Sequence, residues 1–267
     1  IRMRIIILIL ILVLHVGTFS VVSANELTKN NFYYDIQWGH IIVGNITVQQ
    51  EKKNSGIKLR VKSQSEGALS ILYDYQSDLV ASSYKEGKVW RGNSYMVNSF
   101  FGSERYYSKV FWDKKTGKLD FDIKPPLDLE KVYDVPRLSL NDVVDPVTAI
   151  LKILEKINRK ESCEDKLGIF DGRRRYNLST KELKKEYLIN DRPRSFKGRT
   201  IVCGLKFTPI GGHRRKSEWA PAADKFSDIK IYELTNISIL KPLTKLLNLT
   251  PTFPKPIIPR VFFESSV

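Results

Sequence analysis

Hydrophobic and polar residues alternate through residues 32–112, a pattern typical of β-strands that bury one face and expose the other. In Arg105–Trp112, for example, a mixed set alternates with Tyr106, Ser108, Val110 and Trp112. The predicted strands are Phe32–Trp38, Ile41–Gln49, Ile57–Gln64, Leu69–Tyr84, Val89–Phe100 and Arg105–Trp112. Glycine- and asparagine-containing turns separate them at short intervals, which favours an antiparallel meander over 32–123.

An irregular, proline-containing connection at 125–144 comes next, and after it the apolar residues recur with a different period. Asp145 can cap a helix that Pro146 begins, because proline suits the first helical position. Apolar residues then recur with a 3.6-residue period, at Val147, Ile150, Leu151, Leu154 and Ile157. The pattern predicts a helix over 145–158 that lies against the concave or open face of the sheet.

Strand patterns resume after the helix. The expected strands are Lys166–Phe170, Arg174–Leu178, Arg199–Thr208 and Ile229–Asn236, while Thr180–Leu188 fits either a capped helix or a strand. A leucine- and proline-rich segment at 237–259, with a short amphipathic helix at Ile239–Leu249, has an open role. Residues 260–267 resemble the start of a last strand, Val261–Phe263, that is cut short. The fold class is therefore mainly β, a curved antiparallel sheet or open half-barrel with one principal helix across one face.

Residues 1–24 resemble a secretory signal peptide, with Arg2 and Arg4 ahead of the apolar run Ile5–Leu14. Small residues before Asn25 predict cleavage after Ala24, which leaves residues 25–267 as one periplasmic domain with no transmembrane segment. An uncleaved membrane anchor is the alternative.

The mature part contains both cysteines of the chain, Cys163 and Cys203. In an oxidising compartment such a pair is expected to form a disulfide, which here would join strands within 163–236. Two distant cysteines and two mature histidines are too few for a usual metal site, so neither a metal nor a cofactor is expected.

Charge is concentrated in one region of the chain. Residues 152–216 carry 19 basic and eight acidic side chains, whereas the whole chain has 44 basic and 29 acidic ones. Outside the cytoplasm such a region would meet anionic lipid head groups, lipopolysaccharide phosphates or acidic glycans, and not nucleic acid. A general compositional bias toward lysine is the alternative.

Arginines stand out within this basic region. Asp171-Gly172 predicts a tight turn between two strands, and Arg173, Arg174 and Arg175 follow it directly. With Arg214 and Arg215, these side chains are candidate anion-binding residues, because guanidinium groups bind phosphate with paired hydrogen bonds. Alternatively, these arginines pair with Asp171 or another acid and hold the hairpin.

Four segments together resemble the exported bacterial family called domain of unknown function 3108. They are YDIQWGHIIVGNITV (34–48), DPVTAILKIL (145–154), CEDKLGIFDGRRRYNL (163–178) and CGLKFTPIGGHRR (203–215). The resemblance implies a periplasmic β-rich protein whose cysteines lie before the hairpin and within a later strand. It implies no activity and no catalytic residues.

Signals for an enzyme are few. His213 could act as a general base oriented by Asp171 or Asp165, with Ser217 nearby in sequence, but no motif surrounds a nucleophile. No phosphate-binding loop or dinucleotide fingerprint occurs. The sequence therefore predicts a non-enzymatic protein.

A curved sheet with a helix across it could enclose an apolar ligand. The candidate residues are Trp38, Tyr73, Tyr75, Trp90, Trp112, Leu151 and Leu154, and the alternative for each is an ordinary filled core. We expect an envelope protein that binds a lipid or anionic glycolipid. The alternatives are an assembly factor that docks an envelope protein and, third, a hydrolase of envelope polymers.

Overall fold

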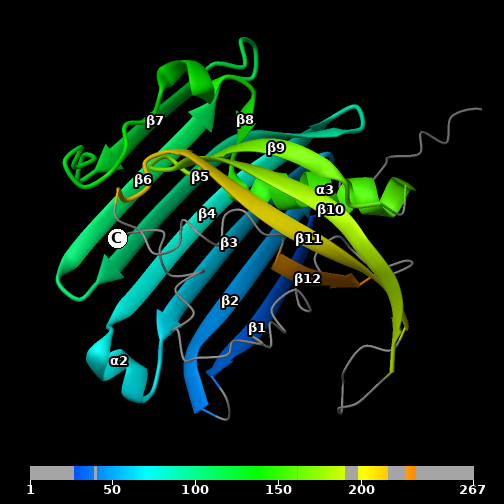
Figure 1. The fold of residues 1–267 in the computed structure, drawn as a ribbon, viewed down its shortest axis with the longest axis horizontal. Coiled ribbons are helices and arrows are strands. Elements are labelled where there is room, and N and C mark those ends of the chain that lie inside the picture. The colour runs from blue at the N-terminus through cyan, green and yellow to red at the C-terminus, as the bar shows by residue number, and fades with distance from the viewer. Residues whose placement is uncertain (1–26, 39–40, 161, 190–197, 216–226, 233–267) are drawn as a thin grey trace, which may run out of the picture.

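Seven antiparallel strands follow one another from residue 28 to residue 124 and form the larger of two sheets (Figure 1). The computed structural model describes residues 27–38, 41–160, 162–189, 198–215 and 227–232. The strands are β1 (Thr28–Trp38), β2 (Ile41–Lys53), β3 (Gly56–Ser65), β4 (Tyr75–Glu86), β5 (Val89–Phe101), β6 (Glu104–Trp112) and β7 (Leu119–Lys124). Each strand pairs with the next in the chain, and the predicted mainly β fold class is confirmed.

One predicted strand starts in the wrong place. Residues 69–74 were expected to begin the strand Leu69–Tyr84, but the short helix α2 (Ala68–Leu72) precedes β4. Gly67 has a positive φ of 61°, and its carbonyl accepts the backbone N–H of Ser70 at 3.2 Å. This glycine-initiated turn overrides the apolar strand pattern of the residues after it.

A second, five-stranded sheet covers part of the first. Its strands, in spatial order, are β12 (Ser227–Tyr232), β11 (Gly198–Gly211), β10 (Arg175–Leu188), β9 (Asp165–Phe170) and β8 (Val143–Val144). The segment Thr180–Leu188, which the sequence left between helix and strand, continues β10. A 3-10 turn, η1 (Arg137–Leu140), lies in the connection before β8.

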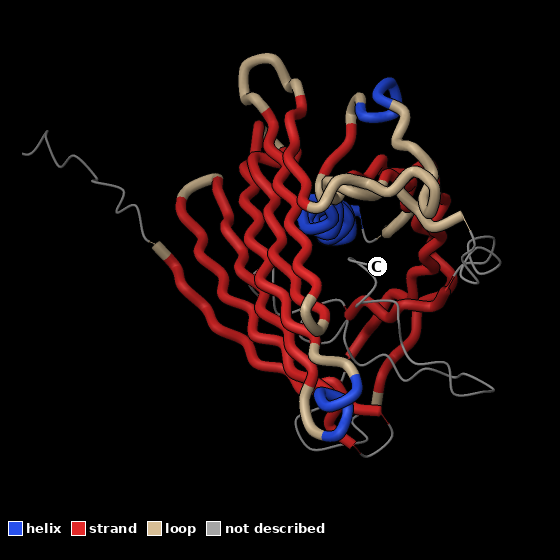
Figure 2. Tube along the Cα trace, turned by 90° about the vertical axis from the view of Figure 1, so that its left-hand side faces the viewer, coloured by secondary structure: helices blue, strands red, loops and turns tan. Residues whose placement is uncertain are grey.

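Helix α3 (Pro146–Lys160) lies between the two sheets, where Figure 2 shows it end-on. Asp145 caps it as predicted, since its Oδ1 accepts the backbone N–H of Thr148 at 2.9 Å. Leu151 packs on the large sheet, whereas Ile153 and Leu154 pack on the second sheet. The helix is therefore covered on two sides, not on the single face that the sequence indicated.

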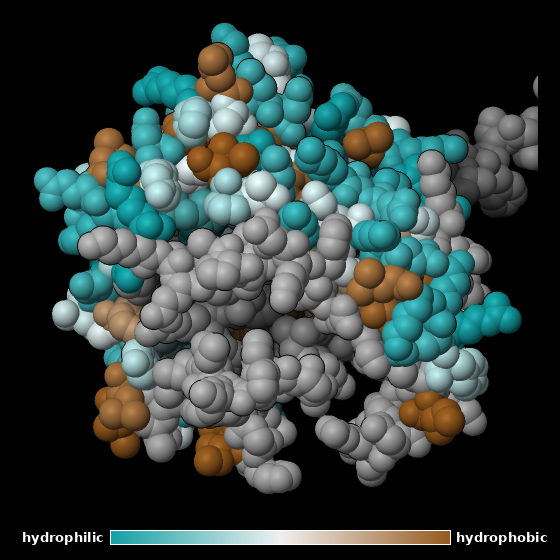
Figure 3. Space-filling view, in the orientation of Figure 1, coloured by the Kyte–Doolittle hydropathy of each residue, from teal (hydrophilic) through white to brown (hydrophobic). Residues whose placement is uncertain are grey.

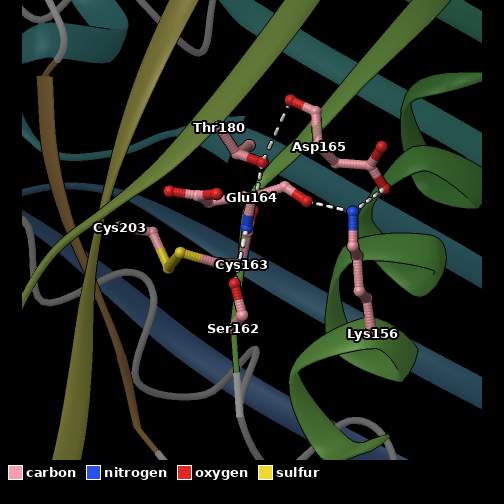
Figure 4. The surroundings of a disulfide bond; sticks show 7 residues. All are labelled: Lys156, Ser162, Cys163, Glu164, Asp165, Thr180 and Cys203. Carbon is pink, nitrogen blue, oxygen red and sulfur yellow. Dashed lines mark hydrogen bonds and ion pairs between the residues drawn. A yellow bond between two sulfur atoms is a disulfide. The ribbon is translucent and has the colours of Figure 1, made fainter. Parts of the chain in front are cut away.

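The disulfide Cys163–Cys203 is confirmed and joins the segment after α3 to β11 (Figure 4). Both cysteines are fully buried. The hydroxyl of Thr180 on β10 donates a hydrogen bond to the Cys163 carbonyl. The disulfide thus holds the segment after α3 against β11 of the second sheet.

Several predicted features lie outside the described residues: the signal peptide 1–24, residues 233–236 of the last full strand, the segment 237–259 with its helix, and the final strand. In the described part of the chain, no helix is long and apolar enough to cross a bilayer.

Candidate functional site

A groove of about 320 Å³ lies between α3, the start of β5 and the start of β9. One wall comes from α3, where positions 152, 155, 156 and 159 share a face because residues three and four apart are neighbours on a helix. The β4–β5 turn, in which Gly87 has a φ of 59°, brings Lys88 into the lining of the groove. Asp165 and Leu167 of β9 line it as well.

Cations outnumber acids in this groove. Four basic side chains line it, namely Lys88, Lys152, Lys156 and Arg159, against Glu155 and Asp165. Both carboxylates already have partners: Glu155 pairs with Arg159 at 3.4 Å, and Lys156 lies 3.6 Å from Asp165 (Figure 4). Lys85, just outside, approaches Glu155 to 2.8 Å. The acids are thus neutralised from within the protein.

Two groove lysines, Lys88 and Lys152, have no ion pair or side-chain hydrogen bond to any described residue. Lys152 is half-buried, and burial lowers the pKa of its ammonium group. The nearby Arg91 lowers this pKa further, while Asp165 and Asp142 oppose the shift. An ammonium group that is partly desolvated and unpaired is favourably placed to accept an anion.

Apolar side chains form the floor. Trp90 is 2% exposed and packs with the fully buried Leu151 and with Ile57 and Leu59 of β3. The Trp90 indole N–H is buried and has no hydrogen-bond partner. The groove therefore combines an apolar base with two unpaired cations.

The arginine hairpin forms where the sequence placed it, between β9 and β10. The Asp171 carboxylate accepts the backbone N–H groups of Arg173 at 2.9 Å and Arg174 at 2.6 Å. Gly172 packs so closely on β6 that a Cβ atom there would lie 1.9 Å from the Ser108 hydroxyl. The Ser108 hydroxyl also donates to the Asp171 carbonyl at 2.6 Å, which seats the hairpin tip on the large sheet.

The candidate anion-binding arginines do not converge on one site. Arg173 donates to the Pro125 carbonyl at 2.9 Å, and Arg175, only 8% exposed, donates to the Ser139 carbonyl at 2.7 Å. Arg174 lies 3.7 Å from the Asp171 carboxylate.

The second arginine pair follows β11 and lies against the connection between β7 and β8. Arg215 donates to the Leu129 carbonyl at 3.3 Å and stacks over Tyr133, while Arg214 forms an isolated β-bridge with Val132. Three of the five guanidinium groups thus bind backbone carbonyls of this irregular connection.

We therefore expect Arg175→Met to lower the free energy of unfolding by about 2 kcal/mol, because it removes the guanidinium donor from the half-buried Ser139 and Tyr176 carbonyls. Arg174→Met, in the same hairpin, is the matched control and should cost less than half as much. Urea denaturation of both variants checks this. Equal losses would contradict a structural role specific to Arg175.

The apolar candidate residues fall into different places. Trp90 and Leu151 share one cluster beneath the groove. Leu154 packs in the core of the second sheet, and the Trp112 indole donates to the Val143 carbonyl at 3.1 Å. Tyr75 is buried, and Tyr73 is exposed; the backbone of Trp38 is described but its side chain is not. The candidate residues with described side chains thus do not share one cavity but belong to separate clusters, and Tyr73 is exposed.

His213 is half-buried and contacts the ring of Tyr176 edge-on, with centroids 6.2 Å apart. Burial lowers its pKa, and the charge of Arg174 lowers it further. No hydrogen bond joins it to Asp171 or Asp165 in the described structure, and Ser217 lies outside the described residues. The described residues also contain no cluster of three metal-ligating side chains.

A buried polar network at the start of α3 was visible in the sequence only as a helix cap. Asp145 is fully buried, and its Oδ2 accepts the Thr148 hydroxyl at 2.5 Å. That hydroxyl shares a 2.7 Å hydrogen bond with Ser83 on β4. Burial raises the pKa of Asp145 to about 6, although the hydrogen bonds from Thr148 and Val147 act to lower it.

Exposed apolar side chains gather at the end of the large sheet that carries α2. They are Ile41, Ile42, Ile71, Leu72 and Tyr73, with exposed fractions from 38% to 86%. We call them the apolar rim. Figure 3 shows hydrophobic side chains over α2 and over the lower end of β2. Apolar side chains grouped at loop tips are typical of a surface that contacts another molecule.

Comparisons with protein-family models, with curated proteins and with solved structures gave no match. The resemblance to domain of unknown function 3108 accordingly stays a prediction, and function has to be argued from the groove and its surroundings.

Proposed function

We propose that this chain is an exported, non-enzymatic binding protein of the bacterial envelope that holds a lipid or anionic glycolipid. The observation that carries the proposal is the groove beside α3, where an apolar floor meets two unpaired ammonium groups. Such a pairing suits an amphiphile, whose anionic headgroup and first apolar carbons can be bound together.

The size of the groove sets how much of an amphiphile it can take. Its volume of about 320 Å³ is near the lower limit for small-molecule pockets, about 300 Å³. It therefore suits a headgroup with the adjoining part of an acyl chain, and not a complete lipid. Trp90 and Leu167 would contact the apolar part, and Lys152 the anion.

Export and a periplasmic location belong to the same proposal. They rest on the N-terminal pattern at residues 1–24 and on the disulfide, a bond that persists in oxidising compartments.

The proposal is tested by purifying the protein from its native envelope, extracting it with solvent and analysing the extract by mass spectrometry. We expect a co-purifying anionic lipid in near-stoichiometric amount with the wild-type protein. In Lys152→Met the amount should fall about tenfold, since one charge-assisted contact is lost. A blank extract from gently purified wild type contradicts the proposal.

A second candidate function, docking of an envelope protein during assembly, is favoured by the apolar rim. A filled core, as seen around Leu151, Phe170 and Val110, is compatible with it. In-cell crosslinking from position 71 or 72 on α2 separates the two: a single protein adduct together with a lipid-free extract favours the assembly factor. Hydrolysis has the weakest support, because His213 has no orienting acid among the described residues.

A further inference from the structure

The charged side chains of the groove indicate which class of anion it binds. Of the four lining cations, Lys156 and Arg159 face the carboxylates of Asp165 and Glu155, within 3.6 and 3.4 Å. Arg159 is held further by a 2.9 Å hydrogen bond to the Lys88 carbonyl. These side chains are committed to the protein, whereas Lys88 and Lys152 have no ion pair with any described residue.

Lys88 and Lys152 line the groove from two different elements. Lys152 comes from α3, and Lys88 comes from the turn before β5. The carbonyl of Lys88 accepts a hydrogen bond from Arg159 of the helix, so the turn and the helix are held together. A ligand in the groove therefore lies beside both lysines and beside Trp90, which also lines it.

We propose that the group bound here is a phosphate monoester, held between Lys88 and Lys152. This inference rests on the proposed function, since it names the headgroup that the groove selects. A phosphate monoester carries a charge of about −1.5 to −2 near neutral pH and offers three acceptor oxygens. A phosphodiester or a carboxylate carries a single charge and would compensate the charge of only one of the two ammonium groups.

The carboxylates of the groove do not cancel this selection. Glu155 and Asp165 line the same groove, but each is paired with a cation of the protein, which reduces its repulsion of a bound anion. A dianion can compensate the charges of both lysines, whereas a singly charged headgroup compensates one. Specificity of this kind arises from the difference between two affinities and not from the total charge.

Vesicle flotation provides the test. One set of phosphatidylcholine vesicles contains about 10 mol% phosphatidic acid, and the other about 20 mol% phosphatidylglycerol, at about pH 8, so that a dianion and a monoanion give comparable surface charge. We expect about tenfold tighter binding to the phosphatidic acid vesicles, the effect of roughly one additional charge-assisted contact. Equal binding to both sets overturns the inference but leaves the proposed function standing. Absence of binding to both, together with a lipid-free extract, overturns the proposed function itself.

Variants test whether the preference for phosphatidic acid depends on the groove lysines. Lys88→Met and Lys152→Met should each abolish the preference for phosphatidic acid, and both should fold, because neither side chain has a described partner. Lys58→Met is the matched control: Lys58 is exposed on β3, whose neighbours Ile57 and Leu59 point to the buried face. Loss of the preference in Lys58→Met as well, or its persistence in both groove variants, overturns the inference.

Titration with soluble phosphate compounds distinguishes a lipid headgroup from a free phosphate ester as the ligand. Glycerol 3-phosphate and inorganic phosphate are titrated by calorimetry against the wild-type protein. Binding that is much weaker than to phosphatidic acid supports a lipid headgroup. Equal binding supports the phosphate assignment and identifies a free phosphate ester as the ligand, and this too should be lost in Lys152→Met.

Discussion

Replacing Cys163 and Cys203 together by alanine is expected to lower the free energy of unfolding by about 4 kcal/mol, the largest effect of any change considered. The bond closes a span of 40 residues, and chain entropy alone gives a stabilisation of about 4 kcal/mol for a loop of that length. Guanidinium denaturation of the oxidised wild type and the double variant measures the difference.

Because the disulfide is buried, reduction of the wild-type protein provides a control for the double variant. Both cysteines are 0% exposed, so a reductant should leave the folded wild type unchanged and should act once denaturant opens the protein. The reduced wild type should then unfold at the same denaturant concentration as the double alanine variant. A difference of less than about 1 kcal/mol between oxidised and variant protein would contradict an entropic stabilisation of this size.

The second large effect concerns pH and the buried Asp145. Its pKa is about 6 in the folded protein, against about 3.9 in an unfolded chain. A carboxyl group whose pKa is raised by folding contributes stability below the unfolded pKa and loses it as the pH rises through the folded pKa. The stability attributable to Asp145 should therefore fall by about 3 kcal/mol between about pH 4 and pH 7.

Asp145→Asn isolates this contribution, because asparagine also caps helices and keeps an oxygen for the Thr148 N–H. Acids such as Asp78, whose pKa is lowered by its hydrogen bond to Arg60, affect stability in the opposite direction and are common to both proteins. The quantity to examine is therefore the difference between the two pH–stability curves. Parallel curves would contradict the prediction, and Asp142→Asn, which removes an exposed carboxylate nearby, reports the effect of losing a charge without burial.

Local patterns predicted the fold well where the determining contacts are local. Alternation identified most strands of the large sheet, and Asp145-Pro146 marked the start of α3 almost to the residue. The second sheet was seen only as separate strands. At one edge of that sheet β8 pairs with β9 in parallel, with Val143 opposite Gly168. No repeating pattern in the chain predicts this contact.

The site was harder to predict for two physical reasons. The groove combines a helix face with a turn 64 residues earlier, at Lys88, and that approach depends on how α3 crosses the sheet. The partners of the arginines were also hidden, because three of the five bind backbone carbonyls, such as that of Ser139, which every residue possesses. Sequence can show that a guanidinium group is present but not which groups it binds.

The seating of the hairpin tip on β6 has a consequence for the order of events during synthesis. A chain emerges from its N-terminus, so the meander, whose pairings are all between consecutive strands, can form while the second half is still being made. The hairpin needs that finished surface, since Gly172 fits directly against Ser108. Cys163 precedes Cys203 by 40 residues, and with two cysteines in the chain there is one intramolecular pairing to make. Formation of the disulfide then reports that β11 has joined the segment after α3, within the second half of the chain.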